Sequence, residues 1–276
     1  MSAEAVARTA LVVAAIRARE SAQEQPLFHD PFAARLAGPA GRDALAGMVA
    51  QAGEQSTVQI VVRTRFWDQA LLRAAQSAHQ VVLLAAGMDA RAFRLPWPSE
   101  TTVFEVDQPA VIAAKNAALS GEQPRCTRVA LGADLAEGDW PAALTASGLN
   151  PRQPSAWLIE GLLQYLDEPA VRTLLRRVDA LSAPGSVLLF DVVSRALLTS
   201  PVLAEVLEAM AAAGSPWLFG SDDPGGLVEP LGWSAAVTDM TEPGIAYGRW
   251  QTGDAPVGGG YFVEAHARRE EPKAQL

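Results

Sequence analysis

Four carboxylates and one glycine fall where buried strands are expected to end. Gly87 follows the apolar run "VVLLAA", Glu105 and Asp107 close "TTVFEVD", Asp134 follows "VALGA", and Glu160 follows "AWLI". In an open α/β sheet the ligand lies outside the carboxyl ends of the strands, so we expect these residues to share one edge. Carboxylates would repel a pyrophosphate. They suit a ligand that presents hydroxyl donors, an exocyclic amine and a cation.

Each acid also has a purely structural interpretation. Asp107 could cap the helix that opens at "QPAV", Asp134 could be a turn residue, and Glu105 could face solvent beside its strand. Glu160 is harder to explain in this way, because an unpaired carboxylate at the end of a buried strand is costly. Asp107, Asp134 and Glu160 together at one edge favour a binding site over three separate structural roles.

S-adenosylmethionine, a nucleoside that carries an amino acid on a sulfonium, has the chemistry that this edge predicts. Its ribose hydroxyls would bind Asp107, its adenine amine Asp134, and its α-ammonium Glu160. The single Gly87 lets the backbone approach the ligand closely, and one glycine suffices where no diphosphate is bound. The cofactor carboxylate needs a cation, and the N-terminal helices offer three: Arg17, Arg63 and Arg65.

Alternating strands and helices position these side chains, which predicts a parallel sheet covered on both faces. Residues 1–78 are helical throughout and lie outside the alternation, so they predict a cap or lid over part of the sheet edge. Within that cap, a short helix is expected to stop at Gly38-Pro39. Residues 79–276 form the core, with a helical insertion near 195–230. The expected strands are 80–87, 97–107, 126–135, 155–166, 186–193 and 260–268.

Composition excludes several classes of protein. The net charge of −9 argues against a nucleic-acid partner, and no apolar run approaches the roughly 20 residues of a membrane span. The run "TALVVAAI" is followed at once by charged residues and lacks a cleavage site, so we predict a cytoplasmic protein. Cys126 is the only cysteine, which leaves no Cys-based metal site, and no metal is predicted. That thiol could be a nucleophile, but its place at the mouth of an apolar run favours burial.

Motifs spread over most of the chain are shared with one known family. They are "TALVVAAIRARES", "PLFHDPFA", "VVRTRFWD", "QVVLLAAGMDARAFRL", "VFEVDQPAVIAAK", "GADL", "WLIEGLLQYL" and "PGSVLLFD". Together they resemble the leucine carboxyl methyltransferase family, in particular its bacterial branch of S-adenosylmethionine-dependent O-methyltransferases linked to polyketide and other secondary metabolism. "FEVDQP" followed by Lys115, and "EGLLQYL", are specific to this family, whereas the glycine alone is a weak indication.

The resemblance implies a class I methyltransferase fold: a Rossmann-like α/β protein with a seven-stranded, mostly parallel sheet whose last strand is antiparallel, and an N-terminal helical cap. It implies that Arg63 pairs with the methionine carboxylate and that Arg17 lies near the same group, although Arg19 competes for that position. It also implies cofactor contacts for Glu160 and an acceptor-side role for Tyr165. The remaining implied contacts are Gly87 with the methionine moiety, Asp107 with the ribose, and Asp134 and Leu135 with the adenine.

The reaction would move a methyl group from S-adenosylmethionine to an oxygen of a small molecule and release S-adenosylhomocysteine. A carboxylate acceptor is already ionised at pH 7 and needs no general base, whereas a phenol or alcohol would need one. Tyr165 and His29 are the candidate catalytic residues, although His29 could equally be a turn residue beside Asp30-Pro31. The acceptor pocket is expected between the cap and the segment after the fifth strand, where Arg249 could meet a substrate anion.

Two other functions remain open on the sequence. A nicotinamide-dependent oxidoreductase could share this layered architecture, but no GxGxxG follows the first strand. A non-catalytic protein could keep the S-adenosylmethionine pocket as a binding or scaffold module of a pathway. The sequence does not distinguish a monomer from a homodimer.

Overall fold

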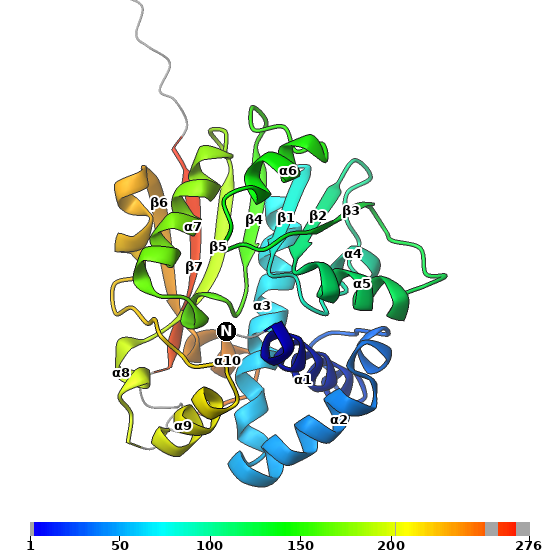
Figure 1. Ribbon diagram of the computed structural model, residues 1–276, viewed down its shortest axis with the longest axis vertical. Helices are drawn as coiled ribbons and strands as arrows, with labels where there is room; N and C mark the ends of the chain where they lie inside the picture. The colour runs from blue at the N-terminus through cyan, green and yellow to red at the C-terminus, as the bar shows by residue number, and fades with distance from the viewer. Residues whose placement is uncertain (1–2, 202, 252–258, 269–276) are drawn as a thin grey trace, which may run out of the picture.

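A single seven-stranded sheet forms the centre of the protein in the computed structural model, which describes residues 3–201, 203–251 and 259–268 (Figure 1). The strand order is β3-β2-β1-β4-β5-β7-β6, and β7 alone runs opposite to the direction of the other six strands. The predicted mostly parallel sheet with an antiparallel last strand is therefore confirmed. The strands are β1 (Gln80–Leu84), β2 (Thr102–Asp107), β3 (Thr127–Gly132), β4 (Ser155–Ile159), β5 (Val187–Val193), β6 (Trp233–Asp239) and β7 (Gly260–Ala267).

Helices cover both faces of the sheet, as the apolar runs of its central strands require. Every residue of β1, β4 and β5 is buried, which is typical of parallel strands covered on both sides. Val81 and Leu83 pack on the α3 side, whereas Val82 and Leu84 pack on the α6 and α7 side. The longer helices are α1 (Ala3–Ser21), α2 (Ala33–Ala52), α3 (Val58–Ala74), α5 (Pro109–Ala118), α6 (Trp140–Ala146), α7 (Glu168–Ala180) and α9 (Ala204–Ala212).

Short helical turns fill the connections between these elements. Two of them, α4 and η2, follow the central strands β1 and β4 directly and so border the strand ends. None of the described helices combines the length and apolar character that crossing a membrane requires. The short turns are α4 (Arg91–Arg94), α8 (Arg195–Leu198), α10 (Thr241–Ala246), η1 (Glu54–Thr57), η2 (Leu163–Tyr165), η3 (Gly225–Leu227) and η4 (Glu229–Leu231).

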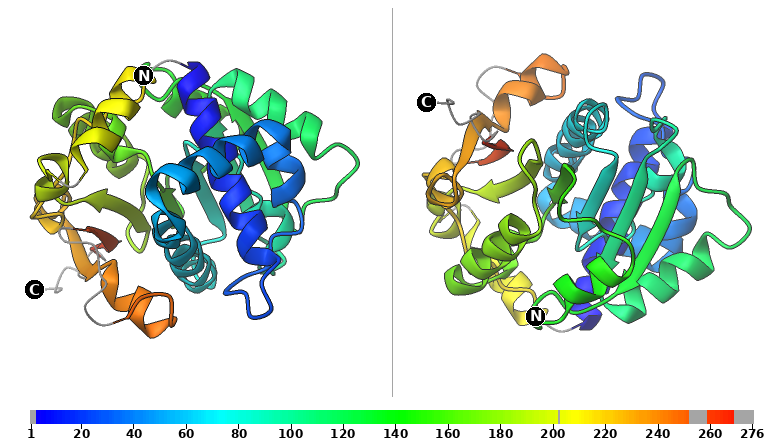
Figure 2. Two further views of the ribbon diagram at one scale, coloured as in Figure 1. Left: turned by 90° about the horizontal axis from the view of Figure 1, so that it is seen from below. Right: turned by 90° about the horizontal axis from the view of Figure 1, so that it is seen from above.

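The helices α1 and α2 lie across one end of the sheet and α3 extends along one of its faces, and all three share its core (Figures 1 and 2). Ile16 of α1 and Trp67 of α3 belong to the same buried cluster as Leu83 of β1. The expected stop at Gly38-Pro39 is only a break, because Gly38 leaves the helical region (φ 58°, ψ −170°) and a second helical stretch begins at Pro39. Proline is tolerated in the first turn of a helix, so the chain resumes α2 there.

The strand order reverses between β1 and β4. The chain runs from β1 outward through β2 to β3, then returns to β4 on the other side of β1. At such a reversal, neighbouring crossovers generally diverge onto opposite faces of the sheet, and ligands bind beyond the carboxyl ends of the two strands. The turns after β1 and β4 are thus the candidate ligand site of this fold.

Candidate active site

The turn after β1 brings Gly87 and Asp107 together. The Gly87 amide donates to Asp107 Oδ2 at 2.6 Å, and the Gln108 amide donates to Oδ1 at 2.6 Å. Gly87 has a φ of 48°, which disfavours a side chain, and an added Cβ would lie 3.2 Å from Ala10 Cβ of α1. The small Ala10 and the bare glycine therefore let the cap lie directly on this turn.

Asp107 does not cap the helix that follows it. The N-cap position of α5 belongs to Gln108, which lacks a side-chain cap bond, and the Asp107 carboxylate instead joins two strand ends. Burial raises the pKa of Asp107, although the amides of Gly87 and Gln108 oppose the rise. The capping alternative is therefore wrong for this residue, whose carboxylate instead binds the turn after β1.

Glu160, at the exit of β4, lies between two arginines. Its Oε1 accepts from Arg63 Nε at 2.9 Å, and its Oε2 accepts from Arg91 Nη1 at 2.6 Å. Arg63 Nη1 also lies 3.4 Å from Asp191 Oδ2, whose other oxygen accepts from the Gly161 amide at 2.8 Å. Burial alone would raise the pKa of Glu160, but Arg91 and Arg63 outweigh it and hold that pKa below its usual value.

Arginines and carboxylates alternate through the interior from the cap to β5, and we call this series the charge ladder. Apart from Arg17, Arg63 and Glu160, its members were not among the residues that the sequence singled out. They come from the cap, α3, α4 and the strand exits, so no local spacing relates them. In order, the ladder runs Arg17, Asp30, Arg94, Asp68, Arg91, Glu160, Arg63 and Asp191.

Charged residues within otherwise apolar stretches were the only sequence indication of the ladder. Asp68 lies on the buried side of α3, where "RFWDQALL" surrounds it with apolar residues. Arg91 and Arg94 lie three residues apart in "ARAFR", so both face α3 from α4. Asp68 binds both of them, with 2.7 Å to Arg91 and 2.6 Å to Arg94. A buried charge of either sign needs such a partner.

Of the cap arginines, Arg17 reaches the turn after β1. Its Nε pairs with Asp30 at 2.9 Å, and its Nη2 donates to the Met88 carbonyl oxygen. Arg19, its competitor in the sequence, instead contacts η1. Arg65 lies near the phenol of Tyr247, the residue just after α10. Arg17 and Arg63 are thus the two of these cap arginines that face the strand ends.

Asp134 and Leu135 lie just beyond β3, next to the end of β2. The Ala133 amide donates to the Asp107 carbonyl oxygen at 2.8 Å, which fixes this turn beside Asp107. Both Asp134 and Leu135 are half-buried. Asp134 Oδ1 accepts from the Ala136 amide at 2.9 Å, so this carboxylate also stabilises its own turn.

Glu105 differs from the other acids. It is fully buried rather than solvent-facing, because its Oε2 accepts from Lys115 Nζ at 2.9 Å and from Arg128 Nη2 at 2.7 Å. Lys115 Nζ also lies 3.5 Å from the Ala86 carbonyl oxygen. Through Lys115, Glu105 therefore helps to stabilise the turn after β1. The expectation that Glu105 faces solvent is wrong.

The two candidate catalytic residues differ in their surroundings. Tyr165 is half-buried in η2. Burial by itself would lower the pKa of Arg63, but Asp191 and Glu160, and more weakly the Tyr165 phenol, raise it. His29 is exposed, although its neighbours Phe28 and Asp30 are buried. Its ring thus lies on the outside of the loop that supplies Asp30 to the charge ladder.

Cys126 fits the structural interpretation. The thiol is half-buried just before β3, and its Sγ lies 3.6 Å from the Ala92 carbonyl oxygen. Burial, together with Glu105, raises the pKa of Cys126 to about 12. It is therefore protonated at neutral pH and is a poor nucleophile.

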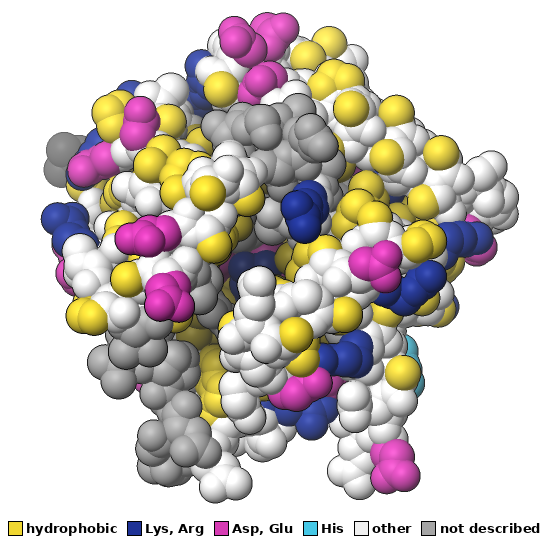
Figure 3. Space-filling model, turned by 60° about the horizontal axis from the view of Figure 1, so that its bottom comes forward, with side chains coloured by type: hydrophobic (Ala, Val, Ile, Leu, Met, Phe, Trp, Pro, Cys, Tyr) yellow, Lys and Arg dark blue, Asp and Glu magenta, His cyan; other side chains and the backbone are white. Residues whose placement is uncertain are grey.

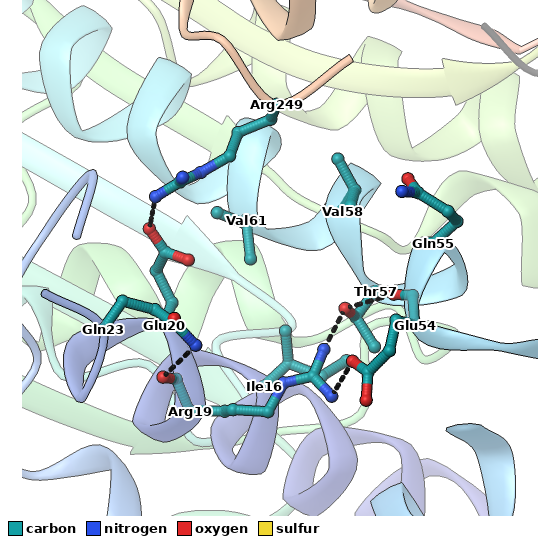
Figure 4. Close-up of a pocket in the computed structure, with 10 residues that line it drawn as sticks. All are labelled: Ile16, Arg19, Glu20, Gln23, Glu54, Gln55, Thr57, Val58, Val61 and Arg249. Carbon is teal, nitrogen blue, oxygen red and sulfur yellow. Dashed lines mark hydrogen bonds and ion pairs between the residues drawn. The ribbon is translucent and has the colours of Figure 1, made fainter. Parts of the chain in front are cut away.

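The face below the strand ends is hollowed and carries both signs of charge (Figure 3). A cavity of about 160 Å³ lies between the cap and the chain after α10 (Figure 4). Arg249 pairs with Glu20 on one side of it, and Arg19 contacts η1 on the other. Apolar side chains lie between these pairs: Ile16, Val58 and Val61. Arg249 thus already has an acidic partner.

Comparisons with known proteins agree with this architecture. Residues 10–179 match the model of a family described as leucine carboxyl methyltransferase. A relative from Frankia alni is 42% identical over 87% of each chain, and one from Parafrankia is 39% identical over 94% of this chain and 86% of that one; both are named as S-adenosyl-L-methionine-dependent methyltransferases. The crystal structure of a DUF574 family protein from Streptomyces avermitilis superposes with a TM-score of 0.60, at 15% identity and over 92% of this chain and 96% of that one.

Proposed function

This chain belongs to the leucine carboxyl methyltransferase family and is an S-adenosylmethionine-dependent methyltransferase, and from that premise we propose that it methylates a carboxylate or hydroxyl oxygen of a small secondary metabolite. The observation that carries the proposal is the convergence of Gly87, Asp107 and the Arg63–Glu160 pair at the reversal of strand order.

The chemistry of these residues fits the cofactor. Arg63 has one nitrogen, Nη2, with no hydrogen-bond partner among the described residues, and it would hold the methionine carboxylate. Glu160 is kept ionised by its arginines and would hold the α-ammonium. Asp107 would accept from the ribose hydroxyls. Asp134 and Leu135 would contact the adenine, while Gly87 and Arg17 would line the methionine moiety.

The cofactor, when bound, supplies a methyl group that is already activated as a sulfonium. The remaining task of the protein is alignment, and orientation of reactants can be worth roughly 7–11 kcal/mol of the barrier. The cap helices, packed onto Gly87 through Ala10, would exclude water from the strand ends. Tyr165 borders the Arg63–Glu160 pair and would face the acceptor. A carboxylate acceptor would need no base, and the exposed His29 would be needed only for a hydroxyl.

Cofactor titration and a transfer assay test this proposal. We expect the protein to bind S-adenosylmethionine at micromolar concentration in isothermal titration calorimetry, and Asp107→Ala or Arg63→Ala to abolish that binding. Asp43→Ala, which removes an exposed acid of α2, is the control and should bind normally. Normal binding by both site variants would refute the site assignment.

The acceptor atom can be identified from the labelled product. The protein is incubated with methyl-labelled S-adenosylmethionine and an extract of the producing cells. A methyl ester releases its label as methanol in mild alkali, whereas a methyl ether keeps it, so alkali lability distinguishes a carboxylate from a hydroxyl acceptor. Cofactor binding with no transfer to any extract would favour the non-catalytic alternative.

A further inference from the structure

Arg91 joins three elements through one guanidinium. Its Nη1 donates both to Asp89 Oδ2 and to Glu160 Oε2, the latter at 2.6 Å. Its Nε donates to Asp68 Oδ1 at 2.7 Å, and its Nη2 lies 3.4 Å from the Thr64 carbonyl oxygen. The turn after β1, the exit of β4 and the helix α3 are therefore held by the same side chain.

Asp89 and Glu160 are the most exposed charged groups along this chain of contacts. Their side chains are 14% and 15% exposed, whereas that of Arg91 is 2% exposed and that of Asp68 is 6% exposed. Both carboxylates bind the same nitrogen of Arg91, so they must lie close together. The two acids therefore offer a ligand more accessible surface than the arginine to which they are bound.

Both acids are ionised in this setting. Burial by itself would raise the pKa of Asp89, but Arg91 and, more weakly, Lys115 hold it at about 2. The guanidinium stays charged at any physiological pH. Two fixed negative charges beside the cofactor site are suited to one cation.

We infer that Arg91 is a positioning residue, which aligns Asp89 and Glu160 as a pair that receives the α-ammonium of S-adenosylmethionine and ties that pair to α3 through Asp68. The inference rests on the cofactor site proposed above. It adds Asp89 to that site as a direct contact of the cofactor. Arg91 acts on the cofactor only by holding the two acids in position.

The chain offers a matched control in Arg94. Arg94 lies one turn along α4 and is equally inaccessible at 3% side-chain exposure, and it binds the same Asp68 carboxylate. It contacts Asp30 rather than Asp89 or Glu160. Arg91→Lys and Arg94→Lys therefore each weaken the hold on Asp68, while only the first disturbs the acid pair. Lysine keeps the charge but cannot bridge several carboxylates as a guanidinium does.

The test compares S-adenosylhomocysteine, which carries the amino-acid end, with methylthioadenosine, which lacks it. For Arg91→Lys we expect the Kd for S-adenosylhomocysteine to rise about tenfold or more, the usual effect of losing a hydrogen bond to a charged group. The Kd for methylthioadenosine should stay within about twofold, because the adenosine contacts are unchanged. Arg94→Lys should change neither Kd, although both variants should lower the Tm.

Equal weakening of both ligands by Arg91→Lys, or an equal loss of S-adenosylhomocysteine affinity in Arg94→Lys, would show that Arg91 is only structural. Asp89→Asn tests the same inference without removing the buried arginine, and it must reproduce the selective loss of S-adenosylhomocysteine. If Arg91→Lys does not fold, an unchanged affinity in Asp89→Asn overturns the inference. Failure of the wild-type protein to bind either ligand would instead contradict the proposed function.

Discussion

Asp107 and Glu160 both end buried strands, yet their surroundings shift their pKa values in opposite directions. Two arginines outweigh the effect of burial and lower the pKa of Glu160, so it is an anion at neutral pH. Burial raises the pKa of Asp107, which makes no ion pair in the described part of the chain and is held by two backbone amides. A fixed anion suits a cation, and a carboxylate held by amides suits hydroxyl donors. In the proposed site, the two acids would therefore contact different ends of the cofactor.

Gly161 provides a test of this arrangement at one residue. It has a φ of 64°, and an added Cβ would lie 3.0 Å and 3.1 Å from Arg63 Nη1 and Nη2. Because Glu160 and Asp191 hold that guanidinium in place, Gly161→Ala must displace it. We expect the Kd for S-adenosylmethionine to rise about tenfold and the free energy of unfolding to fall by about 1–3 kcal/mol, as measured by calorimetry and urea unfolding.

Gly121→Ala is the control for backbone strain alone. Gly121 also has a positive φ, of 84°, but nothing lies within 4 Å of the added Cβ. It should lose a similar part of its stability and keep its cofactor affinity. Equal affinity in the two alanine variants would mean that the position of Arg63 does not matter for binding.

The predictable residues at this scale were those at strand ends. Gly87, Asp107 and Glu160 follow apolar runs directly, so their common edge followed from the parallel sheet alone. Asp68, Asp191 and Arg91 could not be found in this way, because their partners lie far apart in the sequence. Glu105 misled for the same reason. Its alternation with apolar neighbours resembles that of an exposed residue, and only the fold brings Lys115 and Arg128 to it.

At the scale of elements, the strand–helix alternation predicted the sheet because long apolar runs and long amphipathic helices dominate it. Short elements were missed. The four residues of α4 and the six of α10 are too few to show a helical period. The break of α2 at Gly38 was predicted, but its continuation after Pro39 was not, since proline ends one helix and starts another equally well.

Lys115 links the helix α5, the strand β2 and the turn after β1, so its removal should destabilise the fold. It lies on α5, binds Glu105 of β2 and approaches the Ala86 carbonyl oxygen in the turn after β1. Lys115→Met leaves a buried carboxylate short of one partner, so we expect the free energy of unfolding to fall by about 3–5 kcal/mol in urea titrations.

A double-mutant cycle separates the ion pair from packing. Glu105→Gln removes the charge that Lys115 balances, so Lys115→Met combined with Glu105→Gln should be less destabilised than the sum of the two single variants. Additive losses would contradict a coupled buried pair. Arg128, the third member, is 12% exposed and can turn toward water.

At the scale of the molecule, the charge ladder joins the cap to the sheet. Its ion pairs run from Asp30 in the cap to Asp191 in β5, and every side chain in it is at most 15% exposed. Separating the cap from the sheet would leave such charges unpaired, which is strongly unfavourable. The first three helices are therefore held firmly against the rest of the protein along this ladder.

Acid should destabilise the whole folded protein in a narrow pH range, through the Asp89–Arg91 ion pair beside this ladder. Arg91 lowers the pKa of Asp89 to about 2 against the effect of burial. A carboxylate with a lowered folded-state pKa stabilises the fold above its unfolded pKa of about 4, and that contribution is lost as the pH falls toward 2. Asp89→Asn should thus lower the free energy of unfolding by about 2 kcal/mol at pH 7.

In urea titrations from pH 7 to pH 2, the free energy of unfolding of the wild-type protein should fall more steeply below pH 4 and meet that of the Asp89→Asn variant. Asp43→Asn, at an exposed site, controls for the loss of one negative charge. Parallel curves for wild type and Asp89→Asn would mean that Arg91 does not hold this carboxylate in the folded state.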